Sequence, residues 1–225
     1  MSEAVAARLA AVRERIARAA ERAGRGAEVE LVGVAKLHPA ADVVDAVLAG
    51  LGSVGESYAQ EAKAKVPEVA RRLAAAGRLP PRWHFVGRLQ TNKVRKALEA
   101  FNAFHSVDRL DLALELDKRA SHQVSSFVQV NVSGESTKSG FAPDDLEEGL
   151  SRIRAMKRVA LEGLMTMAPA GADARPHFRR LRELAARHGL PGLSMGMSAD
   201  FEAAVEEGAT HVRVGSGLFE GLEPG

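Results

Sequence analysis

Short apolar segments alternate with longer amphipathic segments along most of the chain. The short segments have the length and composition of buried strands, and they cover residues 29–36, 53–56, 83–86, 103–107, 126–132, 161–167, 193–195 and 211–214. The amphipathic segments have helical spacing and cover residues 40–51, 58–76, 91–100, 108–122, 143–156, 173–188 and 199–208. The pattern therefore predicts strands that alternate regularly with helices.

This alternation predicts right-handed βαβ units and a parallel α/β sheet. Eight such units are the number that closes a (β/α)8 TIM barrel. An open, doubly wound sheet is the alternative, but no G-x-G-x-x-G motif follows the first strand. Because the linkers are short and the composition does not change along the chain, we expect residues 1–225 to form a single domain.

One further helix is predicted before the first strand, over residues 1–24. Val5, Leu9, Val12 and Ile16 recur at helical spacing, with arginines and glutamates around the rest of the wheel. The acidic residues and the lack of an uncharged apolar run are unlike a targeting signal. We expect an amphipathic helix packed on the barrel of a cytoplasmic protein.

Composition disfavours several other classes of protein. The chain has no cysteine, so disulfides and thiolate chemistry are excluded. No apolar run approaches the ~20 residues of a membrane span. A net charge of +2 and an aromatic content of 4% do not favour a nucleic-acid partner. The seven histidines show no metal-binding spacing, and His84 is as compatible with a core position as with a ligand.

Lys36 is the first candidate for chemistry. In a strand that reaches residue 36, its side chain shares a face with Val32 and Val34 and lies at the C-terminal mouth of the barrel, where barrel active sites are found. Desolvation there would lower the pKa of the amine, as a Schiff-base lysine requires. A strand-ending lysine that reaches solvent is the alternative.

Two small-residue turns near the C-terminal end predict a phosphate site. Gly215-Ser216-Gly217 follows the last predicted strand and precedes what looks like a short helix, and Gly196-Met197-Ser198 follows the strand before it. Such turns present backbone N–H groups to an anion. The loops after strands seven and eight are also the usual phosphate site of barrels.

Arg213 interrupts the last apolar strand, on the face opposite Val212 and Val214. A buried guanidinium needs a partner, because an unpaired buried charge is costly. Its partner could be a carboxylate on a neighbouring strand, such as Glu56, or an acceptor on a ligand. A separate cation, Lys138, lies in a glycine- and serine-rich loop after strand five and is expected near the barrel mouth.

Six segments occur in an order that is typical of one family. They are Val34-Ala35-Lys36, Val54-Gly55-Glu56-Ser57-Tyr58 with Gln60-Glu61, Trp83-His84-Phe85-Val86-Gly87 with Leu89-Gln90 and Asn92-Lys93, Ser136-Thr137-Lys138-Ser139-Gly140, Leu193-Ser194-Met195-Gly196-Met197-Ser198 and Val212-Arg213-Val214-Gly215. From about residue 5 to residue 220, the sequence resembles the pyridoxal phosphate homeostasis proteins, whose barrel is similar to that of alanine racemase.

The resemblance implies pyridoxal 5′-phosphate (PLP) as cofactor and assigns roles by position. Lys36 corresponds to the lysine that forms the Schiff base. Ser198, Gly215 and Ser216 fall where the family holds the phosphate. Arg213 falls where the family's arginine faces the pyridine nitrogen.

Two positions depart from the family pattern. Ser57 stands where the family usually has asparagine near the cofactor ring, so the ring contact differs here. Ser216 replaces the usual threonine and keeps a hydroxyl, which we expect to be tolerated.

The resemblance also implies little or no catalytic turnover. An arginine opposite the pyridine nitrogen keeps it neutral and weakens the ring as an electron sink. Racemisation needs acid/base groups on both faces of the substrate carbon, and alanine racemase takes its second group, a tyrosine, from an extra C-terminal domain. The only tyrosine here is Tyr58. We therefore expect a PLP-holding homeostasis protein, monomeric, with PLP-dependent apo-enzymes as candidate partners.

Three other functions stay open at this point. A small PLP-dependent amino-acid racemase is the nearest alternative. A class I aldolase-type barrel would use Lys36 on a sugar phosphate. A barrel that binds RNA or protein would have the glycine turns for purely structural reasons.

Overall fold

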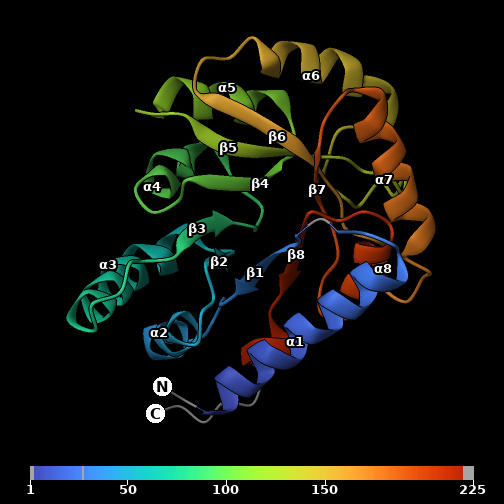
Figure 1. The fold of residues 1–225 in the computed structure, drawn as a ribbon. Helices are drawn as coiled ribbons and strands as arrows, with labels where there is room; N and C mark the ends of the chain where they lie inside the picture. Colours follow the sequence, from blue (N-terminus) through green and yellow to red (C-terminus); the bar gives the residue numbers. More distant parts are fainter. Residues whose placement is uncertain (1–2, 27, 220–225) are drawn as a thin grey trace.

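Eight parallel strands close on themselves, because β1 pairs with both β2 and β8 (Figure 1). The computed structural model describes residues 3–26 and 28–219. The strands are β1 (Glu30–Val34), β2 (Ser53–Glu56), β3 (Arg82–Phe85), β4 (Ala103–Val107), β5 (Val124–Gln129), β6 (Val159–Met165), β7 (Gly192–Ser194) and β8 (His211–Val214). The predicted (β/α)8 barrel is confirmed, and the open sheet is excluded.

Helices surround the barrel and connect successive strands (Figure 1). They are α1 (Glu3–Arg22), α2 (Ala40–Leu48), α3 (Ala59–Ala75), α4 (Val94–Leu98), α5 (Leu110–Arg119), α6 (Leu146–Arg154), α7 (Arg175–Arg187), α8 (Phe201–Glu206) and α9 (Ser216–Phe219), with 3-10 turns η1 (Thr91–Lys93) and η2 (Pro143–Asp145). The short helix expected after Gly215 is therefore present, as is the helix before the first strand.

The boundaries of β5 and β6 differ most from the prediction. Both strands begin two residues earlier than expected, at Val124 and Val159, which pair with each other. The sequence predicts that β5 reaches Val132, but it ends at Gln129, and the sheet pairing of Val130 is an isolated bridge with Phe141. The ends of β5 and β6 depend on where the two strands pair with each other, and the hydrophobic periodicity of one segment carries no information about that pairing.

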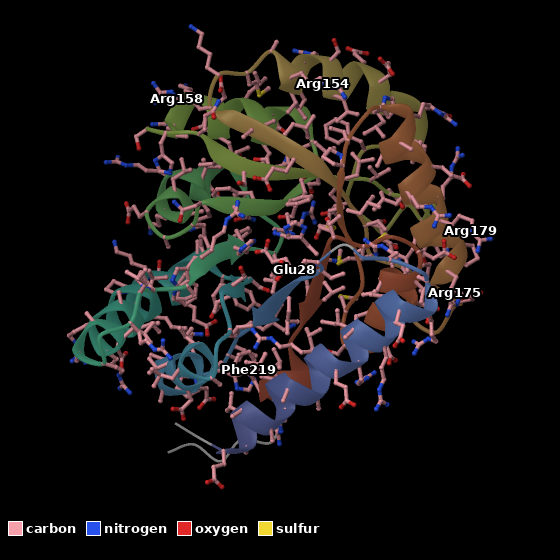
Figure 2. All side chains as sticks on the ribbon, in the orientation of Figure 1. Glu28, Arg154, Arg158, Arg175, Arg179 and Phe219 are labelled. Atoms are coloured by element: carbon pink, nitrogen blue, oxygen red, sulfur yellow. The ribbon has the colours of Figure 1, made fainter. Side chains whose placement is uncertain are left out.

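The interior of the barrel is more polar than is usual for this fold, in which branched apolar side chains predominate. Polar side chains from strands that are not neighbours contact one another there; examples are His105 on β4 with Ser194 on β7, both buried, and buried His84 on β3 with partly exposed Glu30 on β1. Residues from non-adjacent strands can meet only inside the cylinder. Figure 2 shows side chains filling this enclosed space.

Helix α1 packs along α8 and α9, so the first helix lies against the last part of the described chain (Figure 1). Its buried face consists of Val5, Leu9, Val12, Ile16 and Ala19. On its polar face, ion pairs join arginines of α1 to glutamates of α8, at 3.1 Å in one case and 2.7 Å in the other. No helix in the described part of the chain has the length and apolar character needed to span a bilayer.

Replacing Leu9 with alanine should destabilise the whole protein rather than α1 alone. Leu9 is 1% exposed between α1 and the barrel helices, and truncation of a buried leucine costs about 2–5 kcal/mol. Denaturant unfolding should show one transition at lower midpoint. Ala11→Ser, on the exposed face of the same helix, should stay within about 0.5 kcal/mol of the parent protein. A Leu9→Ala protein that melts in two separate steps would contradict this.

Candidate functional site

The turns after β7 and β8 converge at the C-terminal mouth of the barrel, beside the end of β1. The backbone N–H of Gly215 donates to Ser198 Oγ at 3.2 Å, which joins the two turns. A Cβ placed on Gly215 would lie 3.1 Å from Val34 O, so β8 approaches β1 closely at this point. Ser216 begins α9 directly after Gly215. The structure thus brings together Ser198, Gly215 and Ser216 as the sequence predicted.

Lys36 does not lie in a strand, contrary to the prediction. The strand β1 ends at Val34, Ala35 N–H donates to Gly55 O, and the chain then turns. Lys36 is exposed in this turn, so the expected desolvation of its amine is not found. The side chain remains at the mouth of the barrel, two residues beyond the end of β1.

Two side chains from α3 anchor the turn that carries Lys36. Lys65 Nζ donates to Ala35 O at 2.8 Å, and Leu37 N–H donates to Glu61 Oε1 at 2.8 Å. Lys65 and Glu61 also bond to each other at 2.7 Å. The residues on both sides of Lys36 are therefore held by α3. This support lets Leu37 adopt a left-handed backbone conformation, with φ of 65°, which is rare for a residue with a branched side chain.

A buried carboxylate at the end of β2 completes this anchor. Glu56 accepts a hydrogen bond from Lys65, and neither side chain is more than 6% exposed. Burial raises the pKa of Glu56, and the Lys65 ammonium opposes that shift. Sequence reasoning gave Lys65 and Glu61 no role, although their i,i+4 spacing on a predicted helix is the signature of an ion pair.

Arg213 is buried in the barrel and donates to two acceptors. Its Nη1 lies 2.5 Å from Ser194 Oγ, and its Nη2 lies 3.2 Å from Thr166 O. The alternative of an ion pair with Glu56 was wrong, since Glu56 pairs with Lys65. Burial lowers the pKa of Arg213 to about 10, so the guanidinium is still charged at neutral pH.

Ser57 follows the end of β2, and the cavity that it lines does not include Ser198, Gly215 or Ser216. It is half-buried and lines a cavity of about 690 Å³ on the β2–β4 side of the mouth. The same cavity is bordered by the exposed ring of Tyr58 and by the cationic side chains of Arg88, Lys93 and Lys96. The structure records no hydrogen bond between Ser57 and the other predicted site residues that it describes.

Lys138 lies near the mouth, as the sequence predicted. Its Nζ is 3.5 Å from Met167 O, just beyond the end of β6, and 2.9 Å from Glu135 Oε2. The mouth therefore carries a further amine besides Lys36 and the lysines of the cavity that Ser57 lines. Within the described residues, no group of three or more histidine and carboxylate side chains is arranged to hold a metal ion.

Lys65→Met should destabilise the protein by about 3–5 kcal/mol, because it leaves the Glu56 carboxylate buried without its partner. Adding Glu56→Gln should recover much of this loss, since the unpaired charge is then gone. Denaturant unfolding of the single and double variants measures both effects. As a matched control, Lys63→Met removes an exposed lysine of the same helix and should change stability by no more than about 0.5 kcal/mol. A double variant as unstable as Lys65→Met alone would contradict this account.

The comparisons with known proteins agree with this fold. Residues 7–223 match the family model of the alanine racemase N-terminal domain. The chain is 44% identical to a pyridoxal phosphate homeostasis protein of Pseudomonas aeruginosa, over 96% of this chain and 94% of that protein. It is 42% identical to one of Aquifex aeolicus, over 94% and 96%. The structure of PipY from Synechococcus elongatus PCC7942 with PLP bound superposes with a TM-score of 0.81 at 36% identity, covering 96% of this chain and 99% of that chain.

The fold and the converging turns thus define a (β/α)8 barrel of the alanine racemase N-terminal type. Within that class, the chain belongs to the pyridoxal phosphate homeostasis protein family.

Proposed function

We propose that this protein holds PLP as a Schiff base on Lys36 and takes part in intracellular PLP homeostasis with little or no turnover. The observation that carries the proposal is the bond between Ser198 and Gly215, which joins the two small-residue turns beside the end of β1. Lys36 follows that strand, and Arg213 lies in the adjoining last strand. PipY, similar to this chain over nearly its whole length, has been solved with PLP bound.

The residues at the mouth fit the chemistry of PLP. Hydroxyl groups of Ser198 and Ser216 and the backbone N–H groups at the start of α9 are suitable donors for a phosphate ester. Arg213 uses two of its donors on Ser194 and Thr166, and it has further N–H groups for an acceptor on a ring. We assign the phosphate to the turns and the pyridine nitrogen to Arg213.

Lys36 supplies the covalent link in this proposal. Bound PLP supplies an aldehyde and a ring that withdraws electrons. The unprotonated Nζ attacks the aldehyde carbon, a C=N bond forms, and the aldehyde oxygen leaves as water. The exposed position of Lys36 leaves it accessible to an incoming aldehyde, and its anchored turn limits where the amine can reach.

The same geometry supports storage over catalysis. A charged arginine opposite the pyridine nitrogen disfavours protonation of that nitrogen and so weakens the ring as an electron sink. Tyr58, the one tyrosine of the chain, lines the cavity that Ser57 shares, at the ends of β2–β4 rather than at the phosphate turns. A small amino-acid racemase is the alternative function, and sustained racemisation that depends on Lys36 would establish it.

The setting of the protein is part of the proposal. We infer a single-domain, monomeric, cytoplasmic protein with PLP-dependent apo-enzymes as candidate recipients. The position of α1 along α8 and α9 supports the single domain. Light scattering of the purified protein tests whether it is a monomer. A transfer assay tests whether delivery of PLP requires contact: the protein and an apo-enzyme are either mixed or separated by a dialysis membrane, and transfer is compared.

Lys36→Ala should abolish the adduct that borohydride traps after incubation with PLP, because the reacting amine is removed. Peptide mapping by mass spectrometry locates the reduced adduct in the parent protein. Lys138→Ala is the matched control, since Lys138 is another amine at the mouth, and it should retain the adduct on Lys36. An adduct that survives in Lys36→Ala at full yield, on any other lysine, would refute the assignment.

Ser198→Ala combined with Ser216→Ala should weaken binding of PLP by about tenfold to a hundredfold, through the loss of hydrogen bonds to a charged phosphate. Pyridoxal, which lacks the phosphate, should bind the double variant and the parent protein with similar affinity. Equilibrium titration of both vitamers makes the comparison. An equal loss of affinity for both would mean that the phosphate lies elsewhere.

A further inference from the structure

A continuous series of polar contacts runs through the interior of the barrel from Arg213 to Glu30. Arg213 Nη1 lies 2.5 Å from Ser194 Oγ, and Ser194 Oγ lies 2.6 Å from His105 Nδ1. His105 Nε2 lies 2.8 Å from His84 Nδ1. His84 Nε2 lies 3.3 Å from Glu30 Oε1, although it makes no hydrogen bond there. The five residues come from β8, β7, β4, β3 and β1, and we call this series the interior chain.

The donors at one end determine the direction of every bond in the interior chain. An arginine can only donate, so Ser194 Oγ accepts from Arg213. His105 Nδ1 is the other hydrogen-bond partner recorded for Ser194 Oγ among the described residues, so we assign the serine proton to that bond. His105 Nδ1 is then an acceptor, and its proton sits on Nε2, which donates to His84 Nδ1. His84 in turn carries its proton on Nε2, which faces Glu30. Ser194, His105 and His84 therefore each accept a hydrogen bond on the side of Arg213 and present a proton on the side of Glu30.

His105 stays neutral at the centre of the interior chain. It is completely buried and stacks on Phe127, with ring centroids 4.6 Å apart. Burial lowers its pKa well below the ordinary value, and the positive charge of Arg213 acts in the same direction. A protonated His105 would have to donate to both neighbours, so its neutrality preserves the direction of the chain.

Glu30 terminates the chain at the opposite opening of the barrel. It accepts from Ser53 Oγ at 2.6 Å and lies 3.0 Å from His211 Nε2. These polar neighbours, His211 first, hold the pKa of Glu30 well below its usual range. Glu30 and Glu28 line a surface cavity of about 360 Å³, and Figure 2 shows Glu28 near the middle of the molecule in this view. The interior chain thus connects the buried guanidinium of Arg213 to the carboxylate of Glu30, which water can reach.

We propose that Ser194, His105 and His84 are positioning residues for Arg213, and that their one-way hydrogen bonds, which end at His84 facing Glu30, hold the guanidinium in a single orientation at the mouth of the barrel. This deepens the proposed function, on which the link to PLP rests, because Arg213 is the residue assigned to the pyridine nitrogen. The orientation of the guanidinium depends on residues of the protein itself, so it can be measured without PLP.

Substitutions in the interior chain can separate its effect on the orientation of Arg213 from its effect on packing. Gln at position 105 can accept from Ser194 through Oε1 and donate to His84 through Nε2, so His105→Gln keeps the direction of the chain. His105→Leu breaks the chain at its centre, and Ser194→Ala breaks it next to Arg213. Phe127→Leu disturbs the packing against His105 but leaves both ring nitrogens bonded, and it serves as the control.

Nitrogen-15 NMR of the PLP-free protein is the primary test. Both His84 and His105 should be Nε2–H tautomers, and rotation about the Cζ–Nε bond of Arg213 should be slow. That rotation should be about tenfold faster in His105→Leu and in Ser194→Ala, from the loss of a hydrogen bond to a charged group. It should be unchanged in His105→Gln and in Phe127→Leu. Using two broken variants keeps the test decisive if one of them does not fold.

Release of PLP from the loaded protein is the second test. PLP should dissociate about tenfold faster from the two broken variants than from the parent protein, and at the parent rate from His105→Gln. Nδ1–H tautomers, or Arg213 rotation that is equally slow in every variant, would overturn the proposal. If Lys36 forms no adduct, the proposed function fails, and the NMR measurements still decide the role of the interior chain.

Discussion

The pairing of β8 with β1 is the interaction on which the site depends. Residues Glu30–Gly33 align with His211–Val214, and this register closes the cylinder. Without it, Lys36 and the turn at Gly215 would lie at opposite edges of an open sheet, because β1 and β8 are the first and last strands. Closure places an amine, a guanidinium and two small-residue turns around one opening. The chemistry proposed for this protein therefore follows from backbone hydrogen bonds far more than from any single side chain.

The sequence contained enough information to predict the barrel and the two small-residue turns after β7 and β8, because the signals for both are local. Strand–helix alternation is visible within short windows, and the turns containing Ser198 and Gly215 follow directly from the positions of glycine and serine after strands. The environment of Lys36 was not predictable in this way, because its turn is held by Lys65 and Glu61. These two residues lie on α3, which is separated from Lys36 in the sequence by α2 and β2. The same applies to Arg213, whose partners are known only once the barrel has closed.

A polar interior carries a cost in stability and an advantage in specificity. Each buried histidine or serine must find a partner, since an unmet donor or acceptor costs about 1–3 kcal/mol. In a hydrophobic barrel core, many side-chain arrangements have similar energy, whereas a directed series of hydrogen bonds has few alternatives. His105, stacked on Phe127 and bonded on both ring nitrogens, illustrates this restriction. Rigidity of this kind suits the function proposed above, in which a reactive aldehyde is held without being transformed.

The packing of α1 along α8 and α9 has a consequence for biosynthesis. Helix α1 packs on α2, which is made soon after it, but also on α8 and α9, which are made much later, and β1 likewise waits for β8. Proteins whose native contacts join distant parts of the chain fold slowly for this reason. Part of the apolar face of α1 and one edge of β1 must therefore remain without their partners while most of the barrel is translated. Nascent copies of this barrel should need shielding, by chaperones or by the ribosome surface, until the final helix has emerged.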